Sequence, residues 1–277
     1  FMKKGISILA TGLLLAAFAV AGCGGSDKKA AEKKPEQTLK VGVTAGPHAE
    51  ILDNVKKIAA KQGLKVEVVE FNDYIQPNVA LFQGELDLNS MQHRPYLDNT
   101  VKDRKYDLVE VAKSVNFPMA AYSQKIKKGE VIPDGATIGI PNDPTNGGRA
   151  LLLLAAQKLI TLKDGIGVRA TLGDITSNPH NFQFKELDAA IIPRSLSDLD
   201  VAVINTNYAI ASNMNPVKDS IFIESPESPF VNILVTKEKM KDDPRVQTFI
   251  KAYQSEENAK FIADHFKGSV TPGWTNK

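Results

Sequence analysis

The stretch Leu39–Glu70, LKVGVTAGPHAEILDNVKKIAAKQGLKVEVVE, switches from a strand pattern to a helix pattern and back. Leu39–Val43 is a short apolar run, typical of a buried strand. Residues 47–62 then place apolar side chains at helical spacing, and Gly63 stands where that helix would end. Val66–Glu70 is rich in valine and predicts a second strand. This order predicts a βαβ unit with parallel strands.

The same alternation continues on both sides of Phe117 and Pro118. Before them we expect helices over 77–83 and 95–105 and strands over 86–89 and 108–114. After them we expect a helix over 146–159, strands over 137–140, 182–187, 201–205, 221–223 and 231–236, and tail helices over 243–253 and 255–265. The chain therefore has an α/β composition in two halves.

Two α/β halves predict a two-lobed protein rather than one continuous sheet. We expect lobe 1 to comprise residues 39–118 and 237–277, and lobe 2 to comprise residues 119–236. The extended segments 119–124 and 231–236 are interpreted as two paired crossover strands that join the lobes. Ligands bind beyond the carboxyl ends of strands in open α/β sheets, so the predicted site is a cleft between the lobes.

The N-terminal residues indicate export rather than mature structure. Residues 1–22 combine Lys3 and Lys4 with the apolar run Ile6–Ala21, a pattern typical of a signal peptide. The run is short for a transmembrane helix, and an ordinary cleaved signal needs no cysteine after the cut. Cys23 after Val-Ala-Gly resembles the lipobox of bacterial lipoproteins, which implies acylation of Cys23 and a lipid anchor outside the cytoplasmic membrane. Residues 23–38 are polar and predict a flexible tether.

Composition excludes several function classes. Residues 1–39 carry six lysines against three acidic residues, so the chain's net charge of +2 leaves the remaining residues near −1. No basic run indicates nucleic-acid binding. Cys23 is the only cysteine, so disulfides cannot stabilise the fold. The four histidines are scattered, and we expect no metal site and no cofactor.

Polar and aromatic side chains cluster directly after the predicted strands. One cluster begins at Tyr74, and a second contains Met91, His93 and Tyr96, a mixture that suits an apolar side chain carrying a polar atom. Ordinary loop packing is the alternative interpretation of the second cluster. His93 could serve as a catalytic base, but no nucleophile motif accompanies it.

A third cluster, residues 142–149, leads into an apolar helix. Thr145 or Asn146 could cap that helix, and the glycine pair 147–148 could let a ligand approach the backbone. Arg149 can bind a carboxylate through two parallel hydrogen bonds, although a lone arginine is more often a surface residue. Further along the chain, Asn205 and Asn232 offer amide donors and acceptors for an ammonium and a carboxylate, unless they bond neighbouring strands.

These stretches together resemble the NlpA/MetQ family of lipoproteins, the methionine-binding components of ABC importers. The matching pieces run in order through the mature chain: the lipobox, Tyr74–Asn78, Asp87–Tyr96, Asn142–Arg149, Leu196–Tyr208 and Ser228–Asn232. The resemblance implies a two-lobed periplasmic-binding-protein fold of type II character, and no enzymatic activity. This sequence departs from the family pattern at Met91 and at Ser90, two positions where the family usually has an aromatic residue.

The resemblance also implies residue roles. Tyr74, Met91, His93 and Tyr96 would line the side-chain pocket, and Arg149 would bind the α-carboxylate. Asn205 and Asn232 would hold the ligand's backbone groups, with Asn207 as the weaker alternative to Asn205. The implied function is a monomeric, lipid-anchored receptor that passes L-methionine, or D-methionine, to a permease with a cytoplasmic ATPase.

Three alternatives stay open at this point. A methionine-containing dipeptide or another apolar amino acid would keep the class of protein and change the ligand. A secreted α/β hydrolytic enzyme would use His93 with Asp87 or Asp143, although no Gly-x-Ser-x-Gly motif is present. A surface adhesin would need an exposed adhesive face.

Overall fold

The computed structural model describes residues 37–225 and 228–275, which belong to one compact unit. The predicted signal peptide and Cys23 lie outside these residues. The predicted tether was too long at its C-terminal end, because Gln37 and Thr38 already belong to strand β1 and pair with β2. Within the described part of the chain, no helix is long and apolar enough to cross a membrane.

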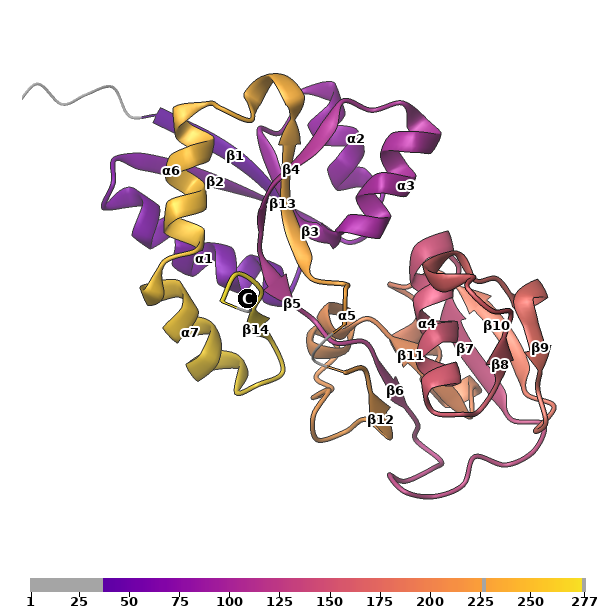
Figure 1. Cartoon of the computed structure of the whole chain (residues 1–277). Coiled ribbons are helices and arrows are strands. Elements are labelled where there is room, and N and C mark those ends of the chain that lie inside the picture. The colour runs from indigo at the N-terminus through magenta and orange to yellow at the C-terminus, as the bar shows by residue number, and fades with distance from the viewer. Residues whose placement is uncertain (1–36, 226–227, 276–277) are drawn as a thin grey trace, which may run out of the picture. The chain divides into compact units, whose positions relative to one another are not determined.

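The first sheet has the strand order β2-β1-β3-β13-β4 (Figure 1). Its strands are β1 (Gln37–Thr44), β2 (Leu64–Phe71), β3 (Leu88–His93), β4 (Leu108–Lys113) and β13 (Asn232–Lys237). As the opening βαβ pattern predicts, β1 runs parallel to β2 and β3. The late strand β13 lies between β3 and β4 and runs antiparallel to both. Five of its six residues are buried, which fits an apolar strand at the centre of a sheet.

Helices cover both faces of this sheet (Figure 1). One face packs on α1 (Pro47–Ala60), α6 (Pro244–Tyr253) and α7 (Glu256–Phe266). The other face packs on α2 (Gln76–Gln83) and α3 (Arg94–Arg104). The apolar face that the sequence predicts for α1, with Ile51, Leu52 and Val55, is fully buried against the sheet.

The second sheet has the strand order β10-β7-β11-β6-β12. Its strands are β6 (Ala120–Tyr122), β7 (Thr137–Pro141), β10 (Gln183–Leu187), β11 (Val201–Ile204) and β12 (Phe222–Ile223). Helix α4 (Pro144–Ala156) packs on one face, and α5 (Thr206–Ala211) with the 3₁₀ segment Ile192–Asp198 packs on the other. Two small strand pairs complete the described residues: β5 (Val115–Asn116) with β14 (Thr271–Pro272), and β8 (Thr161–Leu162) with β9 (Ile175–Ser177).

The two predicted crossover strands do not pair with each other, so that prediction was wrong. β6 pairs with β11 and β12 in the second sheet, whereas β13 pairs with β3 and β4 in the first. Each segment finds its backbone partners in the sheet that it enters, because buried N–H and C=O groups need partners. The residue ranges proposed for the two lobes stay a prediction. β13, which was expected to belong to lobe 2, pairs with strands of the first sheet.

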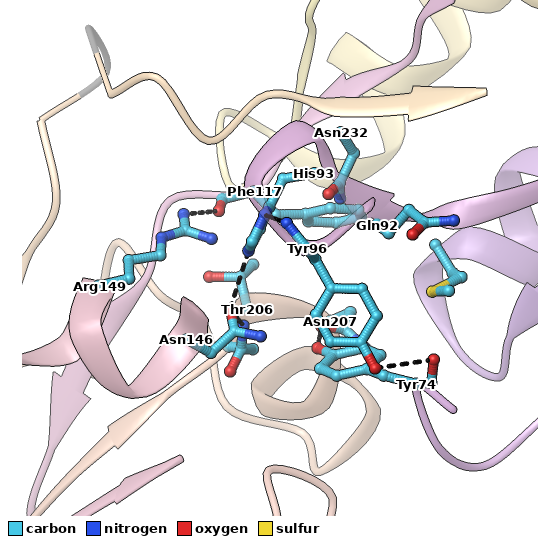
Figure 2. Close-up of a pocket in the computed structure, with 12 residues that line it drawn as sticks. Tyr74, Gln92, His93, Tyr96, Phe117, Asn146, Arg149, Thr206, Asn207 and Asn232 are labelled. Atoms are coloured by element: carbon cyan, nitrogen blue, oxygen red, sulfur yellow. Dashed lines mark hydrogen bonds between the residues drawn. The ribbon is translucent and has the colours of Figure 1, made fainter. Parts of the chain in front are cut away.

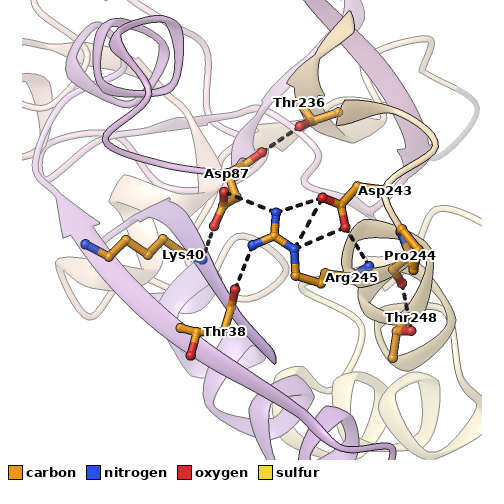
Figure 3. A network of polar contacts seen from close by, with 8 residues as sticks. All are labelled: Thr38, Lys40, Asp87, Thr236, Asp243, Pro244, Arg245 and Thr248. Carbon is orange, nitrogen blue, oxygen red and sulfur yellow. Dashed lines mark hydrogen bonds and ion pairs between the residues drawn. The ribbon is translucent and has the colours of Figure 1, made fainter. Parts of the chain in front are cut away.

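Arg245 ties the C-terminal helices to the first sheet (Figure 3). Its side chain donates to both carboxylate oxygens of Asp243 and, over 2.9 Å, to the carbonyl oxygen of Thr38 in β1. Asp87, before β3, lies 3.9 Å from Arg245 Nη2 and accepts from the Lys40 backbone N–H at 2.8 Å. The hydrogen bond from Arg245 lowers the pKa of Asp243. One guanidinium therefore joins β1, the start of β3 and the start of α6.

Replacing Arg245 with alanine is expected to lower the free energy of unfolding by about 1–2 kcal/mol, because the charge-assisted hydrogen bonds to Asp243 and Thr38 and the ion pair with Asp87 are lost together. Chemical denaturation measures the change, and added salt should shrink it, since the network is partly exposed. Arg194→Ala removes an exposed arginine as the matched control. Equal stability of the two variants would contradict the role given to Arg245.

Candidate functional site

The N-terminus of α4 is capped by Asp143, not by Thr145 or Asn146 as the sequence suggested. The Asp143 carboxylate accepts from the backbone N–H groups of Thr145 at 3.2 Å and Asn146 at 2.9 Å. It also accepts from the Asn146 side-chain amide at 2.9 Å. The protein's own carboxylate therefore occupies the N–H groups at this helix N-terminus, which could otherwise bind an anion.

The glycine pair of this motif serves packing. A β-carbon at Gly148 would lie 2.2 Å from the carbonyl oxygen of Val168, and one at Gly147 would lie 2.8 Å from that of Pro141. The prediction that these glycines admit a ligand was therefore wrong, because protein backbone fills the space. Their role is to let α4 approach its neighbours and so to set the position of Arg149 one residue later.

All seven predicted site residues line one pocket between the two sheets (Figure 2). The pocket is narrow in this structure, with a cavity volume of about 20 Å³. Its lining comprises the predicted Tyr74, Met91, His93, Tyr96, Arg149, Asn205 and Asn232, together with Gln92, Phe117, Asn146, Thr206 and Asn207.

A β-bulge in β3 brings three successive residues to this pocket. The pairing of β3 with β13 shifts between Ile233 and Leu234, which face Gln92 and Ser90, so Met91 is left without a cross-strand partner. Regular alternation would place Met91 and His93 on one face and Gln92 on the other. The bulge re-aims these side chains, and Met91, Gln92 and His93 all reach the pocket.

An amide cluster behind the bulge holds β3 against α2. The Gln92 amide nitrogen donates to Asn78 at 2.7 Å and to Asn89 at 2.9 Å, and Asn78 donates back to Gln92 at 2.9 Å. Asn89 also donates to Asn78 at 2.8 Å. All three side chains are buried, so these mutual bonds satisfy groups that would otherwise be costly to bury. They fix the backbone from which Met91 and His93 project.

His93 connects the two halves of the site. Its Nδ1 accepts from the Tyr96 backbone N–H at 3.2 Å and so caps α3, which leaves the proton of the neutral ring on Nε2. Nε2 donates over 3.1 Å to Asn146 Oδ1 on α4. Burial, helped by the charge of Arg149, lowers the pKa of His93 to about 3. The imidazole is therefore neutral at physiological pH.

This geometry leaves His93 no role as a general base. Nδ1 is occupied by a backbone N–H, and Nε2 carries the proton. Asp87 precedes the opposite end of β3, about 20 Å away at strand spacing, and Asp143 is occupied as the cap of α4. Among the described residues, no group of three His, Cys, Asp or Glu side chains could hold a metal ion.

Arg149 is buried, and most of its donors are engaged by the protein. Nε donates to Glu224 Oε1 at 2.9 Å, and Nη2 donates to Glu224 Oε2 at 2.5 Å and to the carbonyl oxygen of Phe117 at 2.9 Å. The guanidinium also lies 4.4 Å from the centre of the Phe230 ring. The two N–H groups of Nη1 have no partner among the described residues. The two parallel hydrogen bonds that were expected to bind a ligand carboxylate are thus made to Glu224, and the N–H groups of Nη1 are the free donors.

Two asparagines each use one amide atom for the protein and leave the other buried without a partner among the described residues. Asn205 donates to Asn146 at 2.9 Å, and its Oδ1 is unpartnered. Asn207 accepts from the Tyr74 hydroxyl at 2.6 Å, and its Nδ2 is unpartnered. The Asn232 side chain, opposite His93 in the sheet, has no hydrogen bond to another described residue. The site therefore offers free acceptors and free donors close together.

The remaining wall of the pocket is apolar and aromatic. Tyr74 packs edge-on to Tyr96 at 6.0 Å between ring centroids, and the Tyr96 hydroxyl donates to the Tyr74 carbonyl oxygen at 3.1 Å. Burial raises the pKa of both phenols well above the usual value, so both stay neutral. With Met91 and Phe117, these rings form a wall suited to an apolar side chain.

Sequence reasoning missed several residues of this site. Asn146 lies inside the cluster 142–149, but its sequence context predicted only a helix cap. Phe117 and Glu224 carry no local signal, because their importance depends on contacts with Arg149, which lies at least 32 residues away in sequence. Asn207 was ranked below Asn205, although both amides line the pocket.

The low pKa of His93 predicts how acid affects stability. The unfolded state binds a proton on this ring below about pH 6.5 and the folded state only near pH 3, so stability is lost as the pH falls through this window. The slope from this one ring approaches about 1.4 kcal/mol per pH unit. Denaturation of His93→Gln between pH 6.5 and 5 should give a flatter curve than the wild type.

His48 provides a second variant for the same measurement. It is buried against Phe117 at 4.7 Å between ring centroids, and burial lowers its pKa to about 3 as well. His48→Leu should reduce the pH dependence of stability by a similar amount. The double variant should reduce it by the sum of the two effects. Parallel curves for the wild type and His93→Gln would show that His93 is protonated in the folded protein.

Comparison with known proteins finds a matching family and relatives similar over nearly the whole chain. The family model described as NlpA lipoprotein matches residues 39–274. The D-methionine-binding lipoprotein MetQ of Salmonella typhimurium is 46% identical over 268 residues, covering 96% of this chain and 97% of that protein.

Solved structures agree in fold as well as in sequence. A nutrient binding protein from Burkholderia cenocepacia bound to methionine is 50% identical, with a TM-score of 0.83 over 85% of this chain and 99% of that one. An ABC transporter periplasmic substrate-binding protein from Coxiella burnetii is 39% identical, with a TM-score of 0.82 over 85% and 100% of the two chains. These two-lobed relatives confirm the predicted fold class, and the chain belongs to the NlpA lipoprotein family.

Proposed function

We propose that this protein is a lipid-anchored, extracytoplasmic receptor that captures methionine and delivers it to an ABC importer. The supporting observation is the pocket itself, which combines one partly free guanidinium, unpartnered amides and an aromatic wall with Met91. The relatives named for methionine binding support the choice of ligand. Cys23 carries the lipid in this proposal, and a permease with its ATPase is the partner.

Each part of methionine has a matching group in the pocket. The α-carboxylate binds the two N–H groups of Arg149 Nη1, helped by the free Nδ2 of Asn207. The α-ammonium donates to Asn205 Oδ1 and to the Asn232 amide oxygen. The thioether side chain lies against Met91, Tyr74 and Tyr96, since sulfur packs favourably at the edges of aromatic rings.

Contacts from both lobes make binding drive closure. His93 and Tyr74 come from the first half, while Arg149 and Asn205 come from the second. A ligand that touches both sets binds the closed arrangement more tightly than the open one, and it shifts the population by that difference in affinity. The protein binds and releases methionine unchanged, as expected of a transport receptor rather than an enzyme.

A dipeptide containing methionine is the second candidate ligand. A neighbouring pocket shares Tyr74 and Tyr96 with the first and extends toward Asp103, Arg104 and Asp143. A second residue attached to methionine would enter this pocket past the two tyrosines. Free methionine remains the first choice because the inner pocket alone supplies partners for both of its charged groups.

Calorimetry on the full chain in mild detergent, after unfolding and refolding to remove carried ligand, tests the proposal. L-Methionine should bind with one-to-one stoichiometry and a negative heat-capacity change, as burial of an apolar side chain requires. D-Methionine and methionyl dipeptides are titrated in parallel. Heat with a dipeptide or another amino acid, but none with either form of methionine, would keep the cleft and overturn the ligand.

Arg149→Ala should weaken methionine binding by about 100-fold or more, because the ligand's carboxylate loses its charged partner. The unliganded variant should also lose about 3 kcal/mol of stability, since Glu224 is left buried without its cation. Arg194→Ala serves again as the exposed control. Unchanged affinity in a folded Arg149→Ala protein would show that the carboxylate binds elsewhere.

A further inference from the structure

We propose that Glu224 is a positioning and specificity-determining residue, which makes the pocket select ligands that carry an α-ammonium as well as a carboxylate. Glu224 follows β12 and its side chain is 11% exposed. It does not line the pocket, so it acts on a ligand through the position of Arg149 and through its charge, not by contact. The inference rests on the proposed binding of an amino acid and adds a reason for the choice between amino acids and simple carboxylates.

The contacts of Glu224 fix one orientation of the guanidinium. Its two carboxylate oxygens accept from Arg149 Nε and Nη2, at 2.9 and 2.5 Å. Oε2 also accepts from the Met119 backbone N–H at 3.0 Å, and the Glu224 N–H donates to the Met119 carbonyl oxygen at 2.8 Å. Glu224 is therefore held to the segment entering β6 while it holds Arg149.

Two N–H groups of Arg149 are left for a ligand. A guanidinium has five N–H groups; Glu224 takes two, and the Phe117 carbonyl oxygen takes a third. The Phe230 ring, 4.4 Å from the guanidinium carbon, stacks against the group. Rotation that would turn the Nε edge toward the pocket would break all of these contacts. Only Nη1 faces the ligand, and its place is set by Glu224.

Glu224 also sets the charge that a ligand meets. Among the described residues, Arg149 is the only formally charged side chain that lines the pocket, and the neutral ring of His93 adds no charge. The paired carboxylate offsets the charge of Arg149, so an anionic ligand gains less than it would from an unpaired guanidinium. A zwitterion gains in two places, because its ammonium finds the unpartnered Oδ1 of Asn205 and the attractive field of Glu224.

Competition between methionine and its analogue 4-(methylthio)butanoate, which lacks the ammonium, tests the proposal. Calorimetry gives both dissociation constants for the wild type, Glu224→Gln and Glu224→Asp. Glutamine keeps the shape and removes the charge, so the preference for methionine over the analogue should fall by about tenfold. Aspartate restores the charge and should restore most of the preference. Glu186→Gln makes the same charge change on an exposed strand and should leave the ratio unchanged.

The ratio separates this role from a structural one. A variant that is simply less well folded binds both ligands more weakly and keeps their ratio, and an unchanged ratio in Glu224→Gln overturns the proposal. A wild-type protein that binds no methionine would refute the proposed function instead. In that case the Arg149 Nε–H resonance, assigned with Arg149→Lys, still tests the positioning role without ligand. Its exchange with water should be faster in Glu224→Ala, and an unchanged rate would overturn that role.

Discussion

The burial of one cation organises the centre of this protein. Arg149 is 3% exposed, and a charge removed from water must be paired and hydrogen-bonded or it destabilises the fold. Its partners come from both connections between the halves: Phe117 on the way out, and Glu224 and Phe230 on the way back. Met119, also on the way out, donates its backbone N–H to Glu224. The two connections therefore meet around Arg149. In the proposed binding mode, the ligand's carboxylate contacts the same side chain that these connections hold.

The polar groups of the cleft are arranged before any ligand arrives. Asn146 Oδ1 accepts from His93 and from Asn205, and its own amide donates to Asp143, so its orientation is fixed from three sides. Asn205 and Asn207 are each anchored by one atom and present the other. Ordering these side chains costs nothing further on binding, and preorganisation of this kind raises affinity without additional contacts. The buried unpartnered atoms lower the stability of the unliganded fold, and this loss accompanies the preorganisation.

Local features of the fold could be predicted from the sequence because local spacing determines them. The helical spacing of Ile51, Leu52 and Val55 predicted α1, and the tail helix expected over 243–253 is α6, with Asp243 as its N-cap. The insertion of β13 between β3 and β4 could not be predicted, since it depends on pairing between segments more than 100 residues apart. The site residues after strand ends were identified because parallel strands share one functional edge. The Arg149–Glu224 pair spans 75 residues, and nothing local to Glu224 marks it.

The bulge at Met91 explains how the pocket can vary without losing its ligand. The groups proposed to hold the ligand's charges lie on α4, at the start of α5 and on β13, whereas Met91 projects from the β-bulge in β3. The amide cluster of Asn78, Asn89 and Gln92 fixes that backbone independently of the side chain at position 91. Methionine, unbranched and polarisable, fills an irregular space that a rigid aromatic ring would fill in one way only. In the proposed binding mode, a change at this position therefore alters the shape offered to the ligand's side chain, while the contacts to its carboxylate and ammonium stay with Arg149, Asn205 and Asn232.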